Sequence, residues 1–222
     1  MKIVRSGISV DGGDFKLSVS KIVKEQKFNK IIETGTYLGL GTTSIIANSL
    51  NNKYKMYTIE VNPSRALEAT KNLHKYKNIE VITGLSIPKF LLPNEEETTE
   101  FLNRYENIEG IWVDHQKYNR AQLYVEECDF DGIPDDCLGM CMKKFDYKPD
   151  LVMLDSAGHM GFIEFKYVLS LLKGSCVFIL DDVNHVKHYD SLRLMKNDSR
   201  FNVLKISSER FGFCIAEYNY QG

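Results

Sequence analysis

The feature that most constrains the fold is a glycine-punctuated turn between an apolar strand and a helix. The apolar run 28–32 ends in Glu33, and a helix is expected to begin near Thr42. Between them stand Gly35, Gly39 and Gly41. Glycine lets a backbone turn sharply and approach a ligand closely, because it has no Cβ. A strand, a tight loop and a helix N-terminus in this order predict a cradle for a nucleotide-like ligand.

The length and composition favour one globular enzyme-sized domain. With 222 residues, 43% hydrophobic and 26% charged, the chain is long enough for one α/β domain with a sizeable core. A net charge of -2 argues against nucleic acid as an obligate partner. No apolar run reaches the ~18 residues of a membrane span, and the first residues lack a signal-peptide core. Five cysteines, an odd number, fit a reducing compartment, so we expect a cytoplasmic protein without a membrane partner.

Strand and helix patterns alternate along most of the chain. Strands are expected over 28–33, 54–60, 79–83, 150–155, 175–180, 201–207 and 211–218, and helices over 14–26, 42–50, 63–76, 86–92, 161–172 and 189–196. The last two strands are too close for a parallel crossover, so they must form an antiparallel hairpin. The sequence therefore predicts an α/β, Rossmann-like, doubly wound and mostly parallel seven-stranded sheet with a C-terminal antiparallel hairpin.

The segment 93–148 interrupts this alternation and is too long for an idle loop. It follows the third strand, so it starts at the ligand-binding edge of the sheet. We expect a single domain over 1–222 in which this segment either caps the site or forms a homo-oligomer interface. A cap would offer the aromatic side chains Trp112, Tyr118, Tyr124 and Phe130. The spacing of Cys128, Cys137 and Cys141 lacks a C-x-x-C pair, which favours buried apolar thiols over a zinc site with His115.

Acidic residues end or follow three of the predicted parallel strands. Glu60 ends the second strand, Asp155 the fourth, and Asp181 and Asp182 follow the fifth. Ligands bind at this edge of open α/β sheets. Hard carboxylate oxygens suit Mg²⁺, Ca²⁺ or Mn²⁺, and such a cation would lower the pKa of a substrate hydroxyl. In the alternative interpretation Asp155 caps the following helix, and Asp181 and Asp182 are turn residues.

Two histidines flank these acids and are candidate proton acceptors. His185 and His159 have side chains whose ordinary pKa suits a general base near neutral pH. Lys187 is a further candidate if its pKa is lowered. Each histidine has the alternative role of a surface or helix-capping residue.

The spacing E-x-G-x-x-x-G-x-G from Glu33 resembles motif I of class I S-adenosylmethionine (SAM)-dependent methyltransferases, and the terminal hairpin is similar to theirs. The resemblance implies that the acid and the glycine loop hold the methionine end of SAM. It also implies that Glu60 binds the ribose hydroxyls and that Ser86 contacts adenine, although Ile82 or Leu85 packing on the purine is an equal alternative. The cofactor residues expected on this basis are Glu33, Gly35, Thr36, Gly39, Gly41, Thr42, Glu60, Ser86 and Asp155.

The pattern L-D-S-x-x-H around Asp155 and the later acidic pair resemble the cephalosporin hydroxylase/rhamnosyl O-methyltransferase group and the macrocin-type O-methyltransferases. This resemblance implies a divalent cation held by Asp155, Asp181 and Asp182, with Asp155 also catalytic. We therefore expect a SAM-dependent methyltransferase that acts on an oxygen of a small molecule, such as a sugar or secondary metabolite. In the metal-assisted form of this expectation, Mg²⁺ or another divalent cation assists the transfer. The alternatives are a metal-free N- or protein methyltransferase, a nicotinamide-dependent oxidoreductase, and a non-catalytic binding module.

Overall fold

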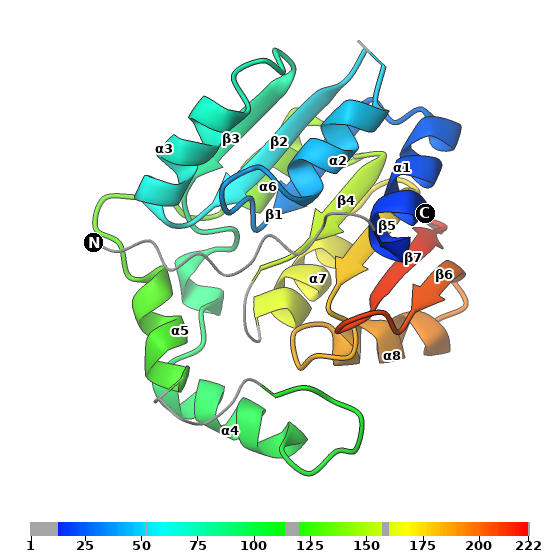
Figure 1. Cartoon of the computed structure of the whole chain (residues 1–222). Coiled ribbons are helices and arrows are strands. Elements are labelled where there is room, and N and C mark those ends of the chain that lie inside the picture. The colour runs from blue at the N-terminus through cyan, green and yellow to red at the C-terminus, as the bar shows by residue number, and fades with distance from the viewer. Residues whose placement is uncertain (1–12, 52, 114–119, 157–159, 222) are drawn as a thin grey trace.

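The computed structural model describes residues 13–51, 53–113, 120–156 and 160–221. In these residues the chain forms one seven-stranded sheet with helices on both faces (Figure 1). The strands are β1 Lys30–Thr34, β2 Lys55–Glu60, β3 Ile79–Thr83, β4 Leu151–Leu154, β5 Cys176–Asp181, β6 Phe201–Ser207 and β7 Phe213–Tyr218. The helices are α1 Asp14–Gln26, α2 Thr42–Ser49, α3 Pro63–Asn72, the 3₁₀ turn η1 Lys89–Leu91, α4 Glu95–Tyr105, α5 Arg120–Cys128, α6 Cys137–Lys144, α7 Met160–Leu171 and α8 Tyr189–Asn197.

The strand order is β3-β2-β1-β4-β5-β7-β6. Among the described strands only β7 runs against its neighbours, because its pairs with β5 and β6 are antiparallel and the remaining pairs are parallel. The chain starts in the middle of the sheet at β1, moves outward to β3 and then returns to β4 on the other side of β1. The predicted fold class, a mostly parallel seven-stranded sheet with a C-terminal antiparallel hairpin, is confirmed.

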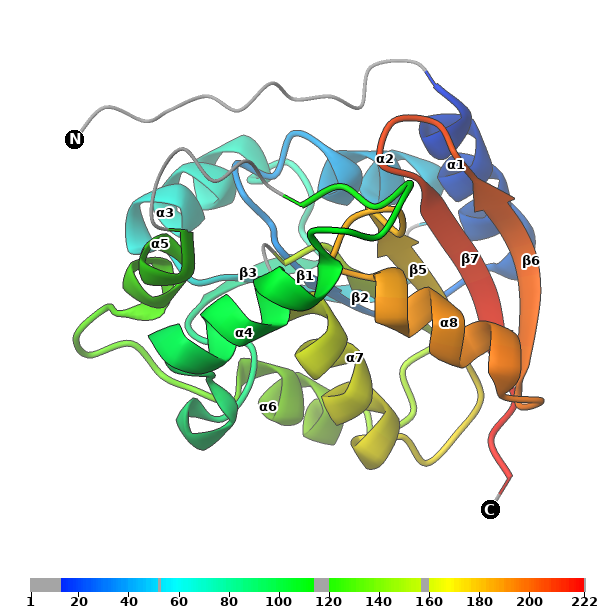
Figure 2. The ribbon, with the colours of Figure 1, turned by 90° about the horizontal axis from the view of Figure 1, so that it is seen from below.

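Helices cover both faces of the sheet (Figure 2), and an apolar cluster holds them to each face. On one face, Val19 and Val23 of α1 and Ile46 of α2 pack against Ile31 and the other buried strand residues of that face. On the opposite face the helices α6, α7 and α8 contribute Leu138, Met142, Phe165, Val168, Leu192 and Met195 to the larger cluster. The strands β1, β2, β4, β5 and β7 supply side chains to both clusters, which explains their continuous apolar sequences.

The register of the parallel strands brings their carboxyl ends into one row. Thr34 of β1 pairs with Ile59 of β2 and with Leu154 of β4, and Leu154 pairs with Leu180 of β5. The next residue of each strand therefore lies at the same edge of the sheet. These four residues are Gly35, Glu60, Asp155 and Asp181.

The segment 93–148 divides into two parts in the structure. Helices α4 and α5 lie beyond the carboxyl edge of the strands, whereas α6 belongs to a helical layer of the sheet (Figures 1 and 2). Cys137 and Cys141 of α6 are free, fully buried thiols in that layer. Only α4 and α5 are therefore placed to cover the edge of the sheet where ligands bind in α/β proteins.

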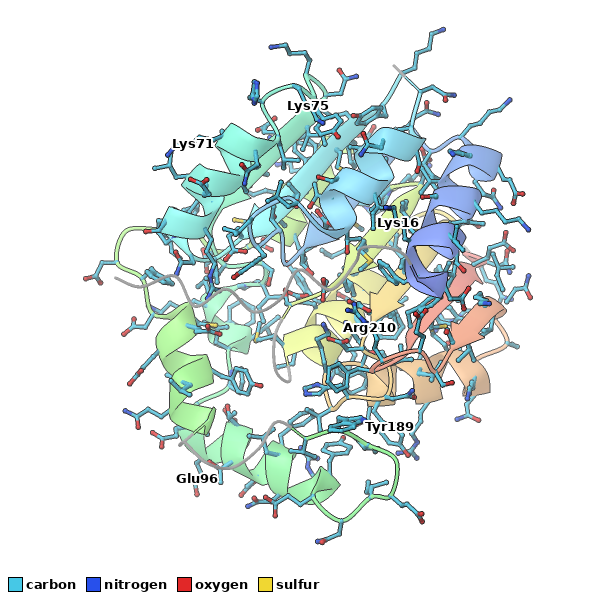
Figure 3. The ribbon with its side chains drawn as sticks, in the orientation of Figure 1. Lys16, Lys71, Lys75, Glu96, Tyr189 and Arg210 are labelled. Carbon is cyan, nitrogen blue, oxygen red and sulfur yellow. The ribbon has the colours of Figure 1, made fainter. Side chains whose placement is uncertain are left out.

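Helix α4 is anchored by aromatic packing against the start of α8. Phe101 and Tyr105 of α4 cluster with Val186 and Tyr189, and the Tyr105 and Tyr189 ring centroids are 6.0 Å apart. Figure 3 shows Tyr189 between these two elements and Glu96 on the outer side of α4. Nearby, the Trp112 N–H donates to the carbonyl of Asn184 at 2.8 Å. None of the helices in the described part of the chain is long and apolar enough to cross a bilayer.

Candidate functional site

A cavity of about 500 Å³ opens at the carboxyl edge of the sheet. Its walls come from the loop after β1, the ends of β2, β4 and β5, and helix α5. The structure brings most of the predicted site residues to this one cavity: Glu33, Gly35, Thr36, Gly41, Thr42, Glu60, Ser86, Asp155, Asp181 and Asp182. Gly39 does not line it, because this residue lies behind the loop against the side chain of Leu73.

The loop after β1 requires glycine at Gly35. This residue has φ of +79°, and a Cβ there would lie 2.4 Å from the carbonyl oxygen of Asp155. The Gly35 and Thr36 N–H groups both donate to the carbonyl of Ile59, at 3.0 and 3.2 Å. The loop is thus fixed between β2 and β4 and passes within contact distance of the backbone of Asp155.

The Glu33 carboxylate lies below this loop and is 1% exposed. Its Oε2 accepts hydrogen bonds from the hydroxyls of Thr43 and Thr58, each at 2.6 Å. Burial raises the pKa of Glu33 to about 7, although the two threonine hydroxyls oppose this and the charge of Asp155 adds to it. A buried carboxylate in this state is poised to gain a cationic partner from the cavity.

The Glu60 carboxylate is held in place by backbone donors. Its Oε2 accepts from the Tyr37 N–H at 2.7 Å, and its Oε1 accepts from the Asn62 N–H at 3.0 Å. Burial raises the pKa of Glu60 despite these two hydrogen bonds. Each carboxylate oxygen has about two acceptor sites, so both oxygens keep capacity for a hydroxyl donor.

A third buried glutamate, Glu164 of α7, forms part of the cavity wall and is fully buried. It accepts from the hydroxyls of Thr34 at 2.8 Å and Ser156 at 2.7 Å, and the Ser86 hydroxyl also bonds it. Burial raises the pKa of Glu164 against the effect of these three hydroxyls. Ser86, which was expected at adenine, is therefore held at the wall of the cavity by Glu164.

Asp155, Asp181 and Asp182 converge as predicted, and one oxygen from each lies within 4.8 Å of the others. The Lys187 ammonium is already in this cluster, with Nζ 2.6 Å from Asp155 Oδ1 and 2.8 Å from Asp182 Oδ2. Burial lowers the pKa of Lys187, but the charges of Asp155, Asp182 and Asp181 outweigh burial and raise it above its ordinary value. Burial and the charge of Asp155 raise the pKa of Asp181 to about 8.

A divalent cation does not fit this arrangement. Asp155 and Asp182 each direct an oxygen at Lys187 Nζ, so both carboxylates already bind a positive charge. A cation with oxygen ligands sits about 2.0–2.6 Å from each of them, which would place it beside the ammonium. The three carboxylates predicted as metal ligands are together, but their cationic partner in this structure is a lysine.

The described histidines near the acid cluster, His185 and His188, do not line the cavity. His185 is 8% exposed, does not line the cavity, and its Nδ1 accepts from the Lys187 N–H at 3.2 Å. His188 is fully buried between Ser191 and the Leu154 carbonyl, and burial lowers its pKa well below the usual value. His159 and His115 lie outside the described residues. The geometry therefore does not favour His185 as the proton acceptor, because Asp155 and Asp181 are nearer to the cavity.

Helix α5 closes one side of the cavity with Tyr124, Glu127 and Cys128. Glu127 Oε1 is 3.5 Å from Arg65 Nη2 of α3, and the Arg65 guanidinium lies over the Tyr37 ring with its carbon 5.2 Å from the ring centroid. Of the predicted aromatic wall, Tyr124 lines the cavity. Trp112 is 53% exposed and packs against Phe211, another cavity residue, with ring centroids 5.3 Å apart. Tyr118 lies outside the described residues.

Several functional side chains were not predicted from the sequence, or were predicted in another role. Thr58 is a polar residue inside a buried strand, and Glu164 is an acid inside a strongly apolar helix. Both are signals of a buried hydrogen-bond partner, because unpaired polar groups are costly inside proteins. Lys187 was considered as a base. No sequence pattern indicated its ion pairs with Asp155 and Asp182.

Comparison with known proteins identifies the fold. No family model matches the sequence, and no curated protein matches it. An O-methyltransferase from Bacillus cereus in complex with SAH has a TM-score of 0.57 and 17% identity, covering 95% of this chain and 84% of that one. The O-methyltransferase TomG from Streptomyces achromogenes, involved in tomaymycin synthesis and in complex with SAM, has a TM-score of 0.56 and 14% identity over 96% and 82%.

A methyltransferase from Geobacter sulfurreducens is similar at a TM-score of 0.55 and 8% identity, covering 94% of this chain and 80% of that one. At such identities the comparison establishes architecture and leaves the choice of acceptor open. These comparisons do not show the narrower resemblance to the cephalosporin hydroxylase and macrocin groups. The chain has the fold of SAM-dependent O-methyltransferases.

Proposed function

We propose that this protein is a SAM-dependent methyltransferase that methylates an oxygen of a small molecule. One observation carries the proposal: the glycine loop, Glu33, Glu60 and the Asp155 cluster, far apart in the sequence, line a single cavity at the carboxyl edge of the sheet. The structural neighbours that contain SAH and SAM support the same donor. Acceptor chemistry is inferred from the cavity itself, because the fold hosts many reactions.

The cavity offers a partner for each polar part of the donor. Glu33 attracts the ammonium of the methionine end, and the first N–H groups of α2, near Gly41 and Thr42, suit its carboxylate because Gly41 provides no capping side chain. Glu60 accepts hydrogen bonds from the ribose hydroxyls with its remaining acceptor sites. Ser86 and Leu85 line the cavity where the purine would follow.

SAM supplies a methyl group on a positively charged sulfur. The acceptor oxygen forms a new bond to this carbon while the carbon–sulfur bond breaks and its electron pair stays on sulfur. The protein then has two tasks, which are to align the acceptor and to receive the hydroxyl proton. Asp155 and Asp181 border the cavity and are the carboxylates placed to receive that proton.

The metal-assisted version of this reaction requires Lys187 to leave its two carboxylates. If it did, Asp155, Asp181 and Asp182 would be the residues that hold a divalent cation, which would acidify the acceptor hydroxyl. Because the ammonium occupies that place, we favour the reaction without a metal. A small-molecule acceptor fits the cavity, since α5 restricts its open side.

Isothermal titration of the purified chain with SAH and, separately, with NADH tests the proposal. We expect SAH to bind and NADH not to bind. Glu60→Ala should weaken SAH binding by about 10- to 100-fold, because hydrogen bonds to a charged group are lost. Glu25→Ala, on the exposed side of α1, is the control and should bind SAH normally. Binding of NADH without binding of SAH would reverse the assignment to an oxidoreductase.

A further inference from the structure

Lys187 is a buried lysine at the place where the fold gathers its acids. The residue is 4% exposed, and its ammonium contacts one oxygen of Asp155 and one of Asp182. Asp181 lies in the same cluster. Distances of 2.6 and 2.8 Å are those of charge-assisted hydrogen bonds. The ammonium is therefore a member of the cluster and not a surface lysine that happens to lie near it.

The backbone around Lys187 is fixed on several sides. The Val186 N–H donates to the Trp112 carbonyl at 3.1 Å, and the Asn184 N–H donates to the Phe211 carbonyl at 2.7 Å. The Lys187 stem runs against Gly161 of α7, where a Cβ would lie 2.7 Å from Lys187 Cγ. The absence of a side chain at Gly161 thus leaves room for the lysine to reach Asp155.

The charges of the cluster explain why a cation is needed there. Three carboxylates within 4.8 Å repel one another, and at least one would be neutral without a positive partner. A lysine ammonium is a compact point charge with three donors, so it can bind two acids and keep a donor for a third group. A divalent cation would perform the same neutralisation, but it would lie beside an ammonium that already binds one oxygen of Asp155 and one of Asp182.

We propose that the Lys187 ammonium is the permanent cation of the Asp155–Asp181–Asp182 cluster, replacing a divalent metal and positioning Asp155 and Asp182 beside the acceptor. The first part, that Lys187 replaces a divalent metal, concerns this chain alone. The second part, that Lys187 positions Asp155 and Asp182 beside the acceptor, rests on the proposed methyl transfer. Lys187 is a positioning residue in this scheme, since it acts through the carboxylates. Methylation is accordingly independent of metal ions.

Mn²⁺ binding, followed by electron paramagnetic resonance, tests the first part without any substrate. The wild-type chain should not bind Mn²⁺ at micromolar concentrations. Lys187→Met keeps the length of the side chain but removes its charge, so the acids should then bind Mn²⁺ at least 10-fold more tightly. Lys187→Arg keeps the charge and should behave as the wild type. Lys196→Met, at an exposed position of α8, is the matched control and should not gain Mn²⁺ binding.

Stoichiometric Mn²⁺ binding by the wild type at micromolar concentration would overturn the proposal, and this result needs no variant. If Lys187→Met fails to fold, the wild-type titration still decides. For the second part, SAH binding and methyl transfer to any acceptor found by screening should persist after EDTA treatment. Activity that is lost with EDTA and restored by Mn²⁺ contradicts it. Failure to bind SAH refutes the methyltransferase assignment and leaves the Mn²⁺ result unchanged.

Discussion

The Glu33 carboxylate is buried beneath the glycine loop, and its protonation links stability to pH. An unfolded glutamate ionises near 4.5, whereas burial raises the pKa of Glu33 to about 7 in the folded chain. Between these values the folded state binds a proton that the unfolded state has lost, so stability falls as the pH rises from 4.5 to about 7. At about 1.4 kcal/mol for each unit of pKa, the loss is about 3 kcal/mol.

Glu33→Gln should therefore be more stable than the wild type above pH 7, by about 1–3 kcal/mol, because the glutamine cannot ionise and still accepts from Thr43 and Thr58. The gain should disappear below pH 4.5. SAH binding should weaken at least about 10-fold, since the partner of the ligand ammonium is lost. Urea unfolding at pH 5 and pH 8, with titration calorimetry, measures both effects. Equal stability of the two proteins at pH 8 would contradict the raised pKa of Glu33.

Gly35 combines a left-handed backbone with a close approach to another strand. Gly35→Ala should lower the free energy of unfolding by about 3 kcal/mol or more, because the methyl group would collide with the Asp155 carbonyl in addition to the cost of a positive φ. It should also abolish SAH binding. Gly110→Ala is a matched control, because Gly110 has φ of +82° but no atom of the described residues lies within 4 Å of a Cβ there. That variant should lose only about 1–2 kcal/mol.

At the scale of elements, α5 is joined to α3 by the ion pair of Arg65 and Glu127, and both residues line the cavity. Glu127→Gln should speed SAH dissociation by up to about fivefold at low salt, since partly exposed pairs contribute at most about 1 kcal/mol. The effect should vanish at high salt, where such pairs are screened. Glu126→Gln, the neighbouring position on α5, is the control. Surface plasmon resonance measures the rates of SAH dissociation. Equal rates for both variants would contradict a contribution of the Arg65–Glu127 ion pair to SAH retention.

The elements differ in how well their sequences predict them. Helix α1 and strand β3 have the bounds that their patterns indicate, 14–26 and 79–83, since each has clear periodicity and a turn at its end. Helix α6 was not separated from the segment 93–148, because its place is decided by packing against β1 and β2. Tertiary contacts, not local propensity, divide this segment into α4 and α5 beyond the edge of the sheet and α6 in a helical layer.

For the whole molecule, the fold and most of the cavity were predictable because parallel strands end at one edge. An acid or glycine just after a strand is brought to that edge by topology alone, which is why Glu60, Asp155 and Asp181 were placed correctly at the cavity. The ion pairs of Lys187 were not predictable, since they depend on the path of the loop after β5 and on the space beside Gly161. Glu164 was missed because its partners come from three places in the chain: Thr34 from β1, Ser86 from the segment after β3, and Ser156 from the segment after β4.

The contact between Gly35 and the carbonyl of Asp155 has a consequence for how new specificities can arise on this scaffold. The glycine loop and the acid cluster meet at one close backbone contact, so a mutation that moves either one disturbs the other. Helix α5 contributes the side chains of Tyr124, Glu127 and Cys128 to the wall of the same cavity. Natural variation or engineering can therefore change the side chains of α5 to suit a different acceptor without altering the carboxyl edge of the sheet.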